Sequence, residues 1–269
     1  MVQAETQQWK RHASGRLATG LEVPLLDPDR GPITRRLARG LGGLRPELAF
    51  VVVMLGGLAL IAGISMLLGL VVTHVIEPTG IGAADERVNV WLAHHRTPSR
   101  THASLVGSII AGGVVLPIVA AIGALLFACL RKWRLAAYFA FGLAVESGTY
   151  RATTMVVHSH RPRVPRLESL PVNASYPSGH TAAAIAVYGG IALLLASRFR
   201  DAGLRVTAWI VALAIVAFVA TSRMYRGMHH PLDVGGGMAV GILALCVIVL
   251  ACRVAGTVAA HRSRVKARS

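Results

Sequence analysis

The sequence predicts an all-α membrane protein, a six-transmembrane-helix bundle with its active site at the outer membrane face. Two observations predict the bundle. Of the 269 residues, 54% are apolar and only 15% are charged, a balance that is unusual for a soluble domain. The apolar residues also gather in six long runs. A helix needs about 20 such residues to cross the hydrocarbon layer, and only helices satisfy their own backbone there without a closed barrel.

The chain divides into three parts. Residues 1–46 are polar and basic, and we expect a mobile cytoplasmic tail with a short helix around Ile33–Leu41. Residues 47–252 form the membrane domain, and residues 253–269 form a second basic cytoplasmic tail. The predicted spans, of which the fifth is the least certain in length, are Leu48–Val72, Leu105–Leu130, Leu135–Val157, Thr181–Ser197, Val206–Thr221 and Val234–Cys252.

Charge predicts the orientation of these spans. The chain has 28 basic and 12 acidic residues, a formal net charge of +16, and basic residues are concentrated in both tails and in the loops at Arg131–Arg134 and Arg198–Arg205. Basic loops favour the cytoplasmic side, so we expect a multi-pass protein of the cell membrane with both termini inside. The tails would meet anionic lipid; no nucleic-acid motif accompanies the charge, so nucleic acid is not an expected partner.

Two shorter features of the chain carry less information. Between Asp85 and His95, the residues Val88, Trp91 and Leu92 share one helical face, which is typical of a short amphipathic helix at the outer interface; a plain surface loop is an equal alternative. The three cysteines lie in or beside apolar runs without metal or redox spacing, and we interpret them as small buried hydrophobes.

The junction of the last two spans carries a histidine and a carboxylate. Pro231 suits the first turn of a helix, on which His229 and Asp233 are four residues apart and neighbours. A carboxylate bonded to one imidazole nitrogen leaves the other as a lone pair, which a histidine nucleophile needs. His230 is three residues from Asp233, so geometry alone does not exclude it. A helix cap with an incidental His–Asp bond is the alternative.

Two further polar strings stand at span ends. At Pro177–His180, Ser178 can cap a helix, Gly179 lets the backbone approach an anion, and His180 would stand beside it as a proton donor. A simple cap is the alternative interpretation. Arg161 and Arg223 carry planar, permanently charged forks that match phosphate oxygens, although arginines at a membrane edge also contact lipid headgroups.

Taken together, these strings resemble the type 2 phosphatidic acid phosphatase (lipid phosphate phosphatase) family, whose pattern is K-x6-R-P … P-S-G-H … S-R-x5-H-x3-D. The second and third blocks are complete here, whereas the lysine position of the first falls on Thr154. The resemblance covers roughly residues 48–252. It selects His229 rather than His230 as the nucleophile.

The resemblance implies a metal-independent phosphatase without a cofactor, which hydrolyses a lipid phosphate or lipid diphosphate of the phosphatidic acid or undecaprenyl diphosphate type through a phosphohistidine. It implies that His229 attacks, Asp233 orients it, and His180 protonates the leaving group. The phosphate-binding residues implied are Arg161, Ser178, Gly179 and Arg223. An extracytoplasmic active site follows from the predicted topology. The same site could serve a phosphotransferase with a non-water acceptor; a non-catalytic phospholipid-binding protein is the third reading. The sequence identifies neither the lipid nor the oligomeric state.

Thr154 leaves one positive charge of the family pattern without an equivalent. Arg151 lies one helical turn before Thr154 and His158 one turn after it, so either is a possible auxiliary group. Glu146, near the middle of the same span, is costly there unless it is paired or protonated, and Arg151 is one candidate partner. We interpret Glu146 as structural rather than catalytic.

Overall fold

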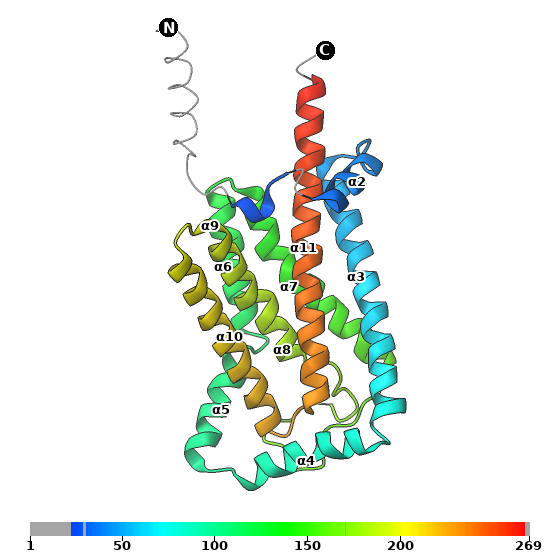
Figure 1. Ribbon diagram of the computed structural model, residues 1–269, viewed down its shortest axis with the longest axis vertical. Helices are drawn as coiled ribbons and strands as arrows, with labels where there is room; N and C mark the ends of the chain where they lie inside the picture. Colours follow the sequence, from blue (N-terminus) through cyan, green and yellow to red (C-terminus); the bar gives the residue numbers. More distant parts are fainter. Residues whose placement is uncertain (1–22, 29–30, 170, 267–269) are drawn as a thin grey trace.

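The computed structural model describes residues 23–28, 31–169 and 171–266, and within these ranges the regular structure is helical (Figure 1). The all-α expectation is therefore confirmed. The long helices and their bounds are α3 (Pro46–Val71), α5 (Pro98–Ile110), α6 (Val115–Cys129), α7 (Trp133–Val156), α10 (Ala202–Tyr225) and α11 (Pro231–Lys266). The shorter elements are η1 (Pro24–Leu26), α2 (Pro32–Gly40), η2 (Val72–Ile76), α4 (Gly80–His94), α8 (Gly179–Ala184), η3 (Ile185–Gly189) and α9 (Gly190–Arg198).

Five helical stretches of the described residues are long and apolar enough to cross a membrane. They coincide with the first, second, fourth, fifth and sixth predicted spans and run over Pro46–Ile76, Pro98–Cys129, Gly179–Arg198, Ala202–Tyr225 and Pro231–Val265. Helix α7 coincides with the predicted third span, but it carries Arg134, Glu146 and Arg151 within 24 residues and is not one of the five. The count of six spans is therefore not confirmed.

The predicted second span is not one continuous helix. It begins at Pro98, seven residues earlier than expected, and breaks at Ala111–Val114, where Gly112 and Gly113 interrupt the hydrogen-bonding pattern between α5 and α6. Hydropathy is unaffected by this break because all the flanking residues are apolar. Helix α5 consequently packs against α10 independently of α6, which packs against α7.

Helix α11 is the central element of the bundle (Figure 1). It packs along α3 and α7 and also contacts α8, η3 and α2. The largest buried cluster lies on this axis and joins Tyr138 of α7, Leu194 of α9 and Ile248 of α11 with residues of α3. The cluster also contains Leu26 and Ala38, so η1 and α2 pack against the end of the bundle where α11 ends. Helix α2 corresponds to the helix expected around Ile33–Leu41.

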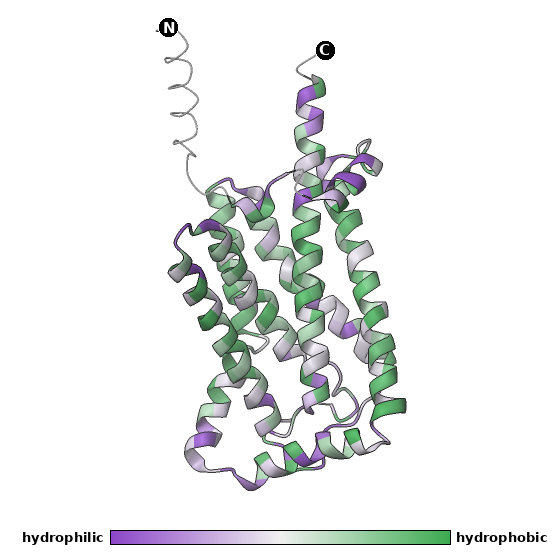
Figure 2. Ribbon diagram, in the orientation of Figure 1, coloured by the Kyte–Doolittle hydropathy of each residue, from purple (hydrophilic) through white to green (hydrophobic). Residues whose placement is uncertain are grey.

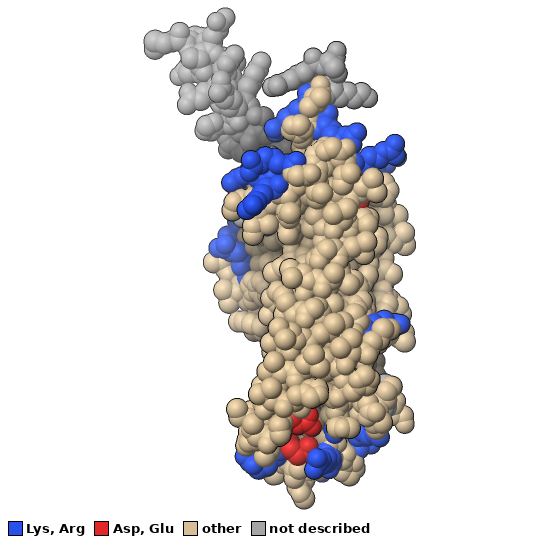
Figure 3. Space-filling view, turned by 90° about the vertical axis from the view of Figure 1, so that its right-hand side faces the viewer, with Lys and Arg blue, Asp and Glu red and all other residues tan. Residues whose placement is uncertain are grey.

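The two ends of the bundle differ in what they carry. Helix α4 lies across one end of the bundle, beside the segment 157–178 and the turn between α10 and α11 (Figure 1). Between the two ends the helices are mainly apolar (Figure 2), and charged side chains concentrate at the ends, with few on the largely uncharged middle (Figure 3). A helix is present at the stretch Asp85–His95, as part of α4, which ends at His94.

Candidate active site

The turn between α10 and α11 presents His229 with a defined tautomer. The ring is 2% exposed, and its Nδ1 lies 2.8 Å from the backbone carbonyl oxygen of Ser175. Because a carbonyl oxygen only accepts, Nδ1 carries the hydrogen and Nε2 keeps its lone pair. Burial, together with the positive charges of Arg223 and Arg161, holds the pKa of His229 well below its ordinary value. The imidazole is thus neutral near pH 7.

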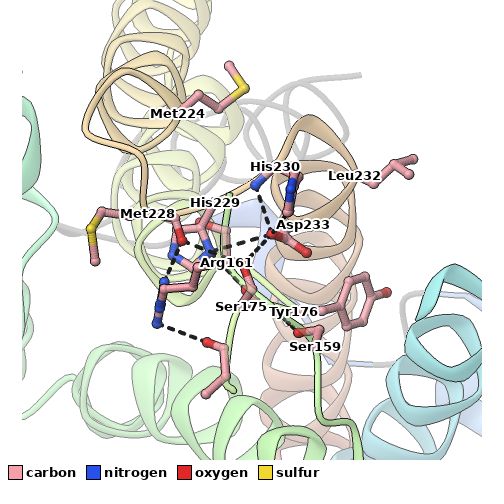
Figure 4. Close-up of polar contacts among 12 residues, drawn as sticks. Ser159, Arg161, Ser175, Tyr176, Met224, Met228, His229, His230, Leu232 and Asp233 are labelled. Carbon is pink, nitrogen blue, oxygen red and sulfur yellow. Dashed lines mark hydrogen bonds and ion pairs between the residues drawn. The ribbon is translucent and has the colours of Figure 1, made fainter. Parts of the chain in front are cut away.

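Asp233 does not hold His229 in the way that the i, i+4 spacing predicts. Its Oδ2 is 3.9 Å from Nδ1 of His229, beyond hydrogen-bond distance, and instead accepts from the Ser175 hydroxyl at 2.6 Å and from the His230 backbone N–H at 2.8 Å (Figure 4). Asp233 is the third residue of α11, and a side chain at that position can accept a hydrogen bond from the backbone N–H of the residue just before the helix, here His230. Asp233 therefore fixes Ser175, and the carbonyl of Ser175 orients His229.

The structure separates His230 from His229 chemically. One ring nitrogen of His230 lies 3.0 Å from Glu86 Oε2 and the other lies 3.4 Å from Asp233 Oδ2. Burial opposes its protonation, but the hydrogen bonds to Asp233 and Glu86 and the negative charges of Asp233 and Asp85 outweigh it and raise the pKa of His230 to about 9. A charged ring with both nitrogens facing carboxylates has no lone pair to attack with, so the geometry favours His229.

The Ser-Gly-His turn rests against glycines of α11. The Ser178 backbone N–H donates to the carbonyl of Asp233 at 2.9 Å, which ties the turn to the start of α11. A Cβ on Gly237 would lie 2.4 Å from the carbonyl oxygen of Ser178, and one on Gly236 would lie 2.4 Å from the Tyr176 ring. Only glycine permits this approach. The turn begins α8 and places His180 on its first turn.

Ser178 and Gly179 differ slightly from the roles that the sequence suggested. Ser178 is the N-cap residue, but its hydroxyl pairs with the Thr181 hydroxyl at 3.0 Å instead of capping a backbone N–H. Gly179 has the Tyr150 ring beside it: a Cβ there would lie 3.2 Å from the ring carbons. Thr181 of the same turn therefore holds the Ser178 hydroxyl, and Tyr150 of α7 leaves no free space beside Gly179.

Arg223 presents donors with no protein partner. Its side chain is fully buried, and its Nη1 donates to Glu168 Oε2 at 2.7 Å and to the Ser108 hydroxyl. Its Nε and Nη2 are buried and have no hydrogen-bond partner. The positive charge of Arg223 acts on His229, whose pKa it helps to lower. Two buried cationic donors without a partner form a ready site for an anion.

Arg161 braces the backbone around His229. Its Nε donates to the Pro171 carbonyl at 2.8 Å, its Nη2 to the Ala174 carbonyl at 3.0 Å, and its Nη1 to the Met228 carbonyl (Figure 4). The segment 157–178 has little regular structure, so its buried carbonyls need donors from side chains. Three of the five N–H groups of Arg161 serve this purpose, which leaves two for the phosphate contact that the sequence suggested.

Four residues that the sequence interpretation passed over shape the site. Glu168 binds both Arg223 and Arg226, Ser108 binds Glu168, and Ser175 links Asp233 to His229. Asn89 of α4 donates to the backbone carbonyls of Met224 at 3.1 Å and His229 at 2.9 Å. Only Glu168 had a usable signal, as the one carboxylate in the arginine-rich segment 157–178.

The auxiliary groups considered for the missing lysine form no hydrogen bond with the site residues described above. Arg151 is exposed, and the Thr154 hydroxyl donates to the Arg151 carbonyl within its own helix. Glu146 is buried and accepts from the Ser147 hydroxyl at 3.0 Å; no ion pair joins it to Arg151. Among the described residues, no group of three His, Cys, Asp or Glu side chains is arranged to hold a metal ion.

Comparison with known proteins matches this geometry to one family. The sequence profile of the PAP2 superfamily matches residues 134–255. The phosphatidylglycerophosphatase B of Bacillus subtilis (strain 168) is 28% identical over 185 residues, which cover 66% of this chain and 88% of that protein. An undecaprenyl-diphosphatase of Sulfolobus acidocaldarius is 40% identical over 75 residues, 28% of this chain and 32% of that protein.

A solved structure shares the fold. The crystal structure of a transmembrane PAP2 type phosphatidylglycerolphosphate phosphatase from Bacillus subtilis superposes with a TM-score of 0.59, at 22% sequence identity. The match covers 71% of this chain and 93% of that chain. The bundle described above is therefore a known membrane-protein fold, and the resemblance inferred from the motifs is confirmed.

Proposed function

Because residues 134–255 match the sequence profile of the PAP2 superfamily, we propose that this chain is a membrane phosphatase that hydrolyses a lipid phosphate or lipid diphosphate. Two features together carry the proposal: His229 is neutral with its hydrogen on Nδ1, and Nε and Nη2 of Arg223 are buried without a hydrogen-bond partner. One group supplies a nucleophilic lone pair and the other supplies charge for the phosphate oxygens. The named relatives act on phosphatidylglycerophosphate and undecaprenyl diphosphate, and both substrates have a phosphate on a lipid.

The proposed reaction has two steps. In the first step, Nε2 of His229 attacks phosphorus, the bond from phosphorus to the leaving oxygen breaks, and protonated His180 gives its proton to that oxygen. In the second step, water loses a proton to His180 and attacks the phosphohistidine, which releases inorganic phosphate and regenerates His229. Arg223 neutralises the phosphate oxygens throughout, and Ser178 and Gly179 line the site beside it.

The indirect support of His229 gives Asp233 a defined part in this reaction. When Nε2 bonds to phosphorus the ring becomes cationic, and the Ser175 carbonyl stabilises the Nδ1–H that remains. Asp233 lies 3.9 Å from that nitrogen, so its negative charge favours the cation without a direct bond. Arg161 holds the backbone on which both contacts depend.

The decisive experiment measures inorganic phosphate released by the purified full-length chain from a panel of lipids: phosphatidic acid, phosphatidylglycerophosphate and undecaprenyl diphosphate. His229→Ala should abolish release, while His102→Ala, an exposed histidine on α5, should leave it unchanged. Full activity of His229→Ala would refute the mechanism. Phosphate that appears on an added alcohol acceptor instead of in solution would identify a phosphotransferase, and no turnover would favour a lipid-binding protein.

We further propose that the site lies outside the cytoplasm. This rests on the basic residues of α2 and of the loops 131–134 and 198–205, which lie at the end of the bundle opposite α4. In a cysteine-free background, cysteines placed at the exposed positions Ser99 and Ala202 separate the two ends. A membrane-impermeant thiol reagent on whole cells should label the first position and spare the second. The reverse result would place the site inside.

A further inference from the structure

One carboxylate holds the arginine that faces the proposed phosphate. Glu168 lies in the segment 157–178, and its Oε2 is 2.7 Å from Nη1 of Arg223. Its Oε1 accepts from Nε of Arg226 at 2.5 Å and from the Ser108 hydroxyl at 2.7 Å. Glu168, from the segment 157–178, therefore binds three polar side chains that come from α5, α10 and the turn after α10.

The contacts of Arg223 divide its guanidinium into two sides. Nη1, on the one side, is occupied by Glu168 and by the hydroxyl of Ser108. Nε and Nη2, which share the opposite edge, are buried and unpartnered. That edge is one of the two with which a guanidinium grips two phosphate oxygens at once. A phosphate can thus bind Arg223 without displacing Glu168.

The carboxylate is itself fixed from its other side. Arg226 donates from Nε to Glu168, from Nη1 to the Ser104 hydroxyl at 3.2 Å, and from Nη2 to the Leu167 carbonyl at 3.1 Å. The side chain of Arg226 is buried, so this anchor is shielded from solvent. Glu168 is consequently held by Arg226 and Ser108, and it in turn holds Nη1 of Arg223.

We propose that Glu168 is a positioning residue that fixes Arg223 by its Nη1 and so aims the Nε–Nη2 edge at the substrate phosphate. The inference deepens the proposed phosphatase function and rests on it for the identity of the anion. Glu168 also balances the charge of Arg223, which would be costly to bury alone in the absence of substrate. It touches neither the substrate nor the reacting atoms.

The test measures anion binding without turnover. Orthovanadate is titrated into the purified full-length chain by calorimetry, for the wild type and for Glu168→Gln, which keeps the shape but removes the charge. The dissociation constant should rise about tenfold in Glu168→Gln, the size of a lost charge-assisted hydrogen bond. Glu77→Gln, an exposed carboxylate at the same end of the bundle, is the matched control and should bind as the wild type does.

A double-mutant cycle separates positioning from a structural role. In an Arg223→Gln background, Glu168→Gln should cause no further loss of affinity because there is no guanidinium left to aim. An equal loss in both backgrounds would overturn the inference, and tighter binding by Glu168→Gln would show that the carboxylate blocks the site. Ser108→Ala removes the other partner of Arg223 Nη1 and should weaken orthovanadate binding about threefold. This variant tests the same inference if Glu168→Gln does not fold.

Activity distinguishes this inference from the proposed function. If the wild type binds orthovanadate and the variants lose affinity as described, the role of Glu168 holds even when no lipid of the panel is hydrolysed. If the wild type releases phosphate from a lipid while Glu168→Gln matches it in KM, in kcat and in orthovanadate affinity, then only the role of Glu168 is refuted. A wild-type chain that does not bind orthovanadate would also refute it.

Discussion

Asn89 gives the sharpest test of how the site is assembled, because no motif includes it. It lies on α4, is fully buried, and its amide nitrogen donates to the carbonyls of Met224 and His229 at 3.1 and 2.9 Å. Asn89→Ala removes both bonds and leaves two buried carbonyl oxygens without donors. At about 0.5–1.5 kcal/mol for each bond, the loss is about 1–3 kcal/mol.

The two lost bonds destabilise the turn between α10 and α11, which carries His229. If about half of this loss acts on the geometry of His229, kcat/KM falls about two- to tenfold, since about 1.4 kcal/mol corresponds to a factor of ten. Asn89→Asp should be worse than Asn89→Ala because a carboxylate has no donor and would face two carbonyl oxygens. The control is Asn173→Ala, an exposed asparagine of the segment 157–178.

The assay is phosphate release from the best lipid of the panel, with thermal unfolding measured on the same preparations. The expected order of kcat/KM is wild type and Asn173→Ala together, then Asn89→Ala, then Asn89→Asp. Wild-type turnover in Asn89→Ala would show that α4 is only a cover over the site. A milder effect of Asn89→Asp would show that the amide does not act as a donor to the two carbonyls.

Three further predictions follow from neighbouring residues. The pKa of His230 is raised from an ordinary 6.5 to about 9, so its protonated ring stabilises the fold fully below pH 6.5, and this stabilisation is lost as the pH rises through about 9. His230→Gln should therefore flatten the fall of Tm between these pH values, and an unchanged slope would contradict a charged His230. Gly237→Ala should lower activity and Tm by pushing the Ser-Gly-His turn away from α11, whereas Gly235→Ala, which has open space around it, should raise helix stability by up to about 1 kcal/mol. Equal effects of the two substitutions would refute the close approach of Gly237 to Ser178. Arg151→Ala should retain nearly full phosphate release because its side chain is exposed, and a tenfold loss would restore it as the substitute for the missing lysine.

Local patterns determined much of this protein. Hydropathy and length located five of the spans because crossing a membrane is a requirement on each segment by itself. Helix α4 and helix α2 were also visible, one from the spacing of its apolar residues and the other from its place in the polar region before the first span. The motif strings stood out because they place His180, Arg223, His229 and Asp233 next to the ends of apolar spans, where a cluster of polar and charged side chains indicates a functional site.

Spacing along one helix was a poorer guide to hydrogen bonds. It placed Asp233 beside His229 correctly, yet the carboxylate bonds to Ser175 and to the His230 backbone instead. The backbone N–H at a helix start competes for the same oxygen, and the Ser175 carbonyl reaches His229 from another segment. Both competitors are invisible in a single stretch of sequence.

The tertiary structure alone decided which polar groups meet. Arg161 bonds to carbonyls on both sides of the site, Glu168 reaches Arg223 across 55 residues of chain, and Asn89 reaches the His229 turn across 140. The same structure separated His230 from His229 by giving it Glu86 as a partner. A residue type fixes only what a side chain can donate or accept. Its partner is set by the packing of α4, α10, α11 and the segment 157–178, because buried polar groups bond to whatever the fold brings within reach.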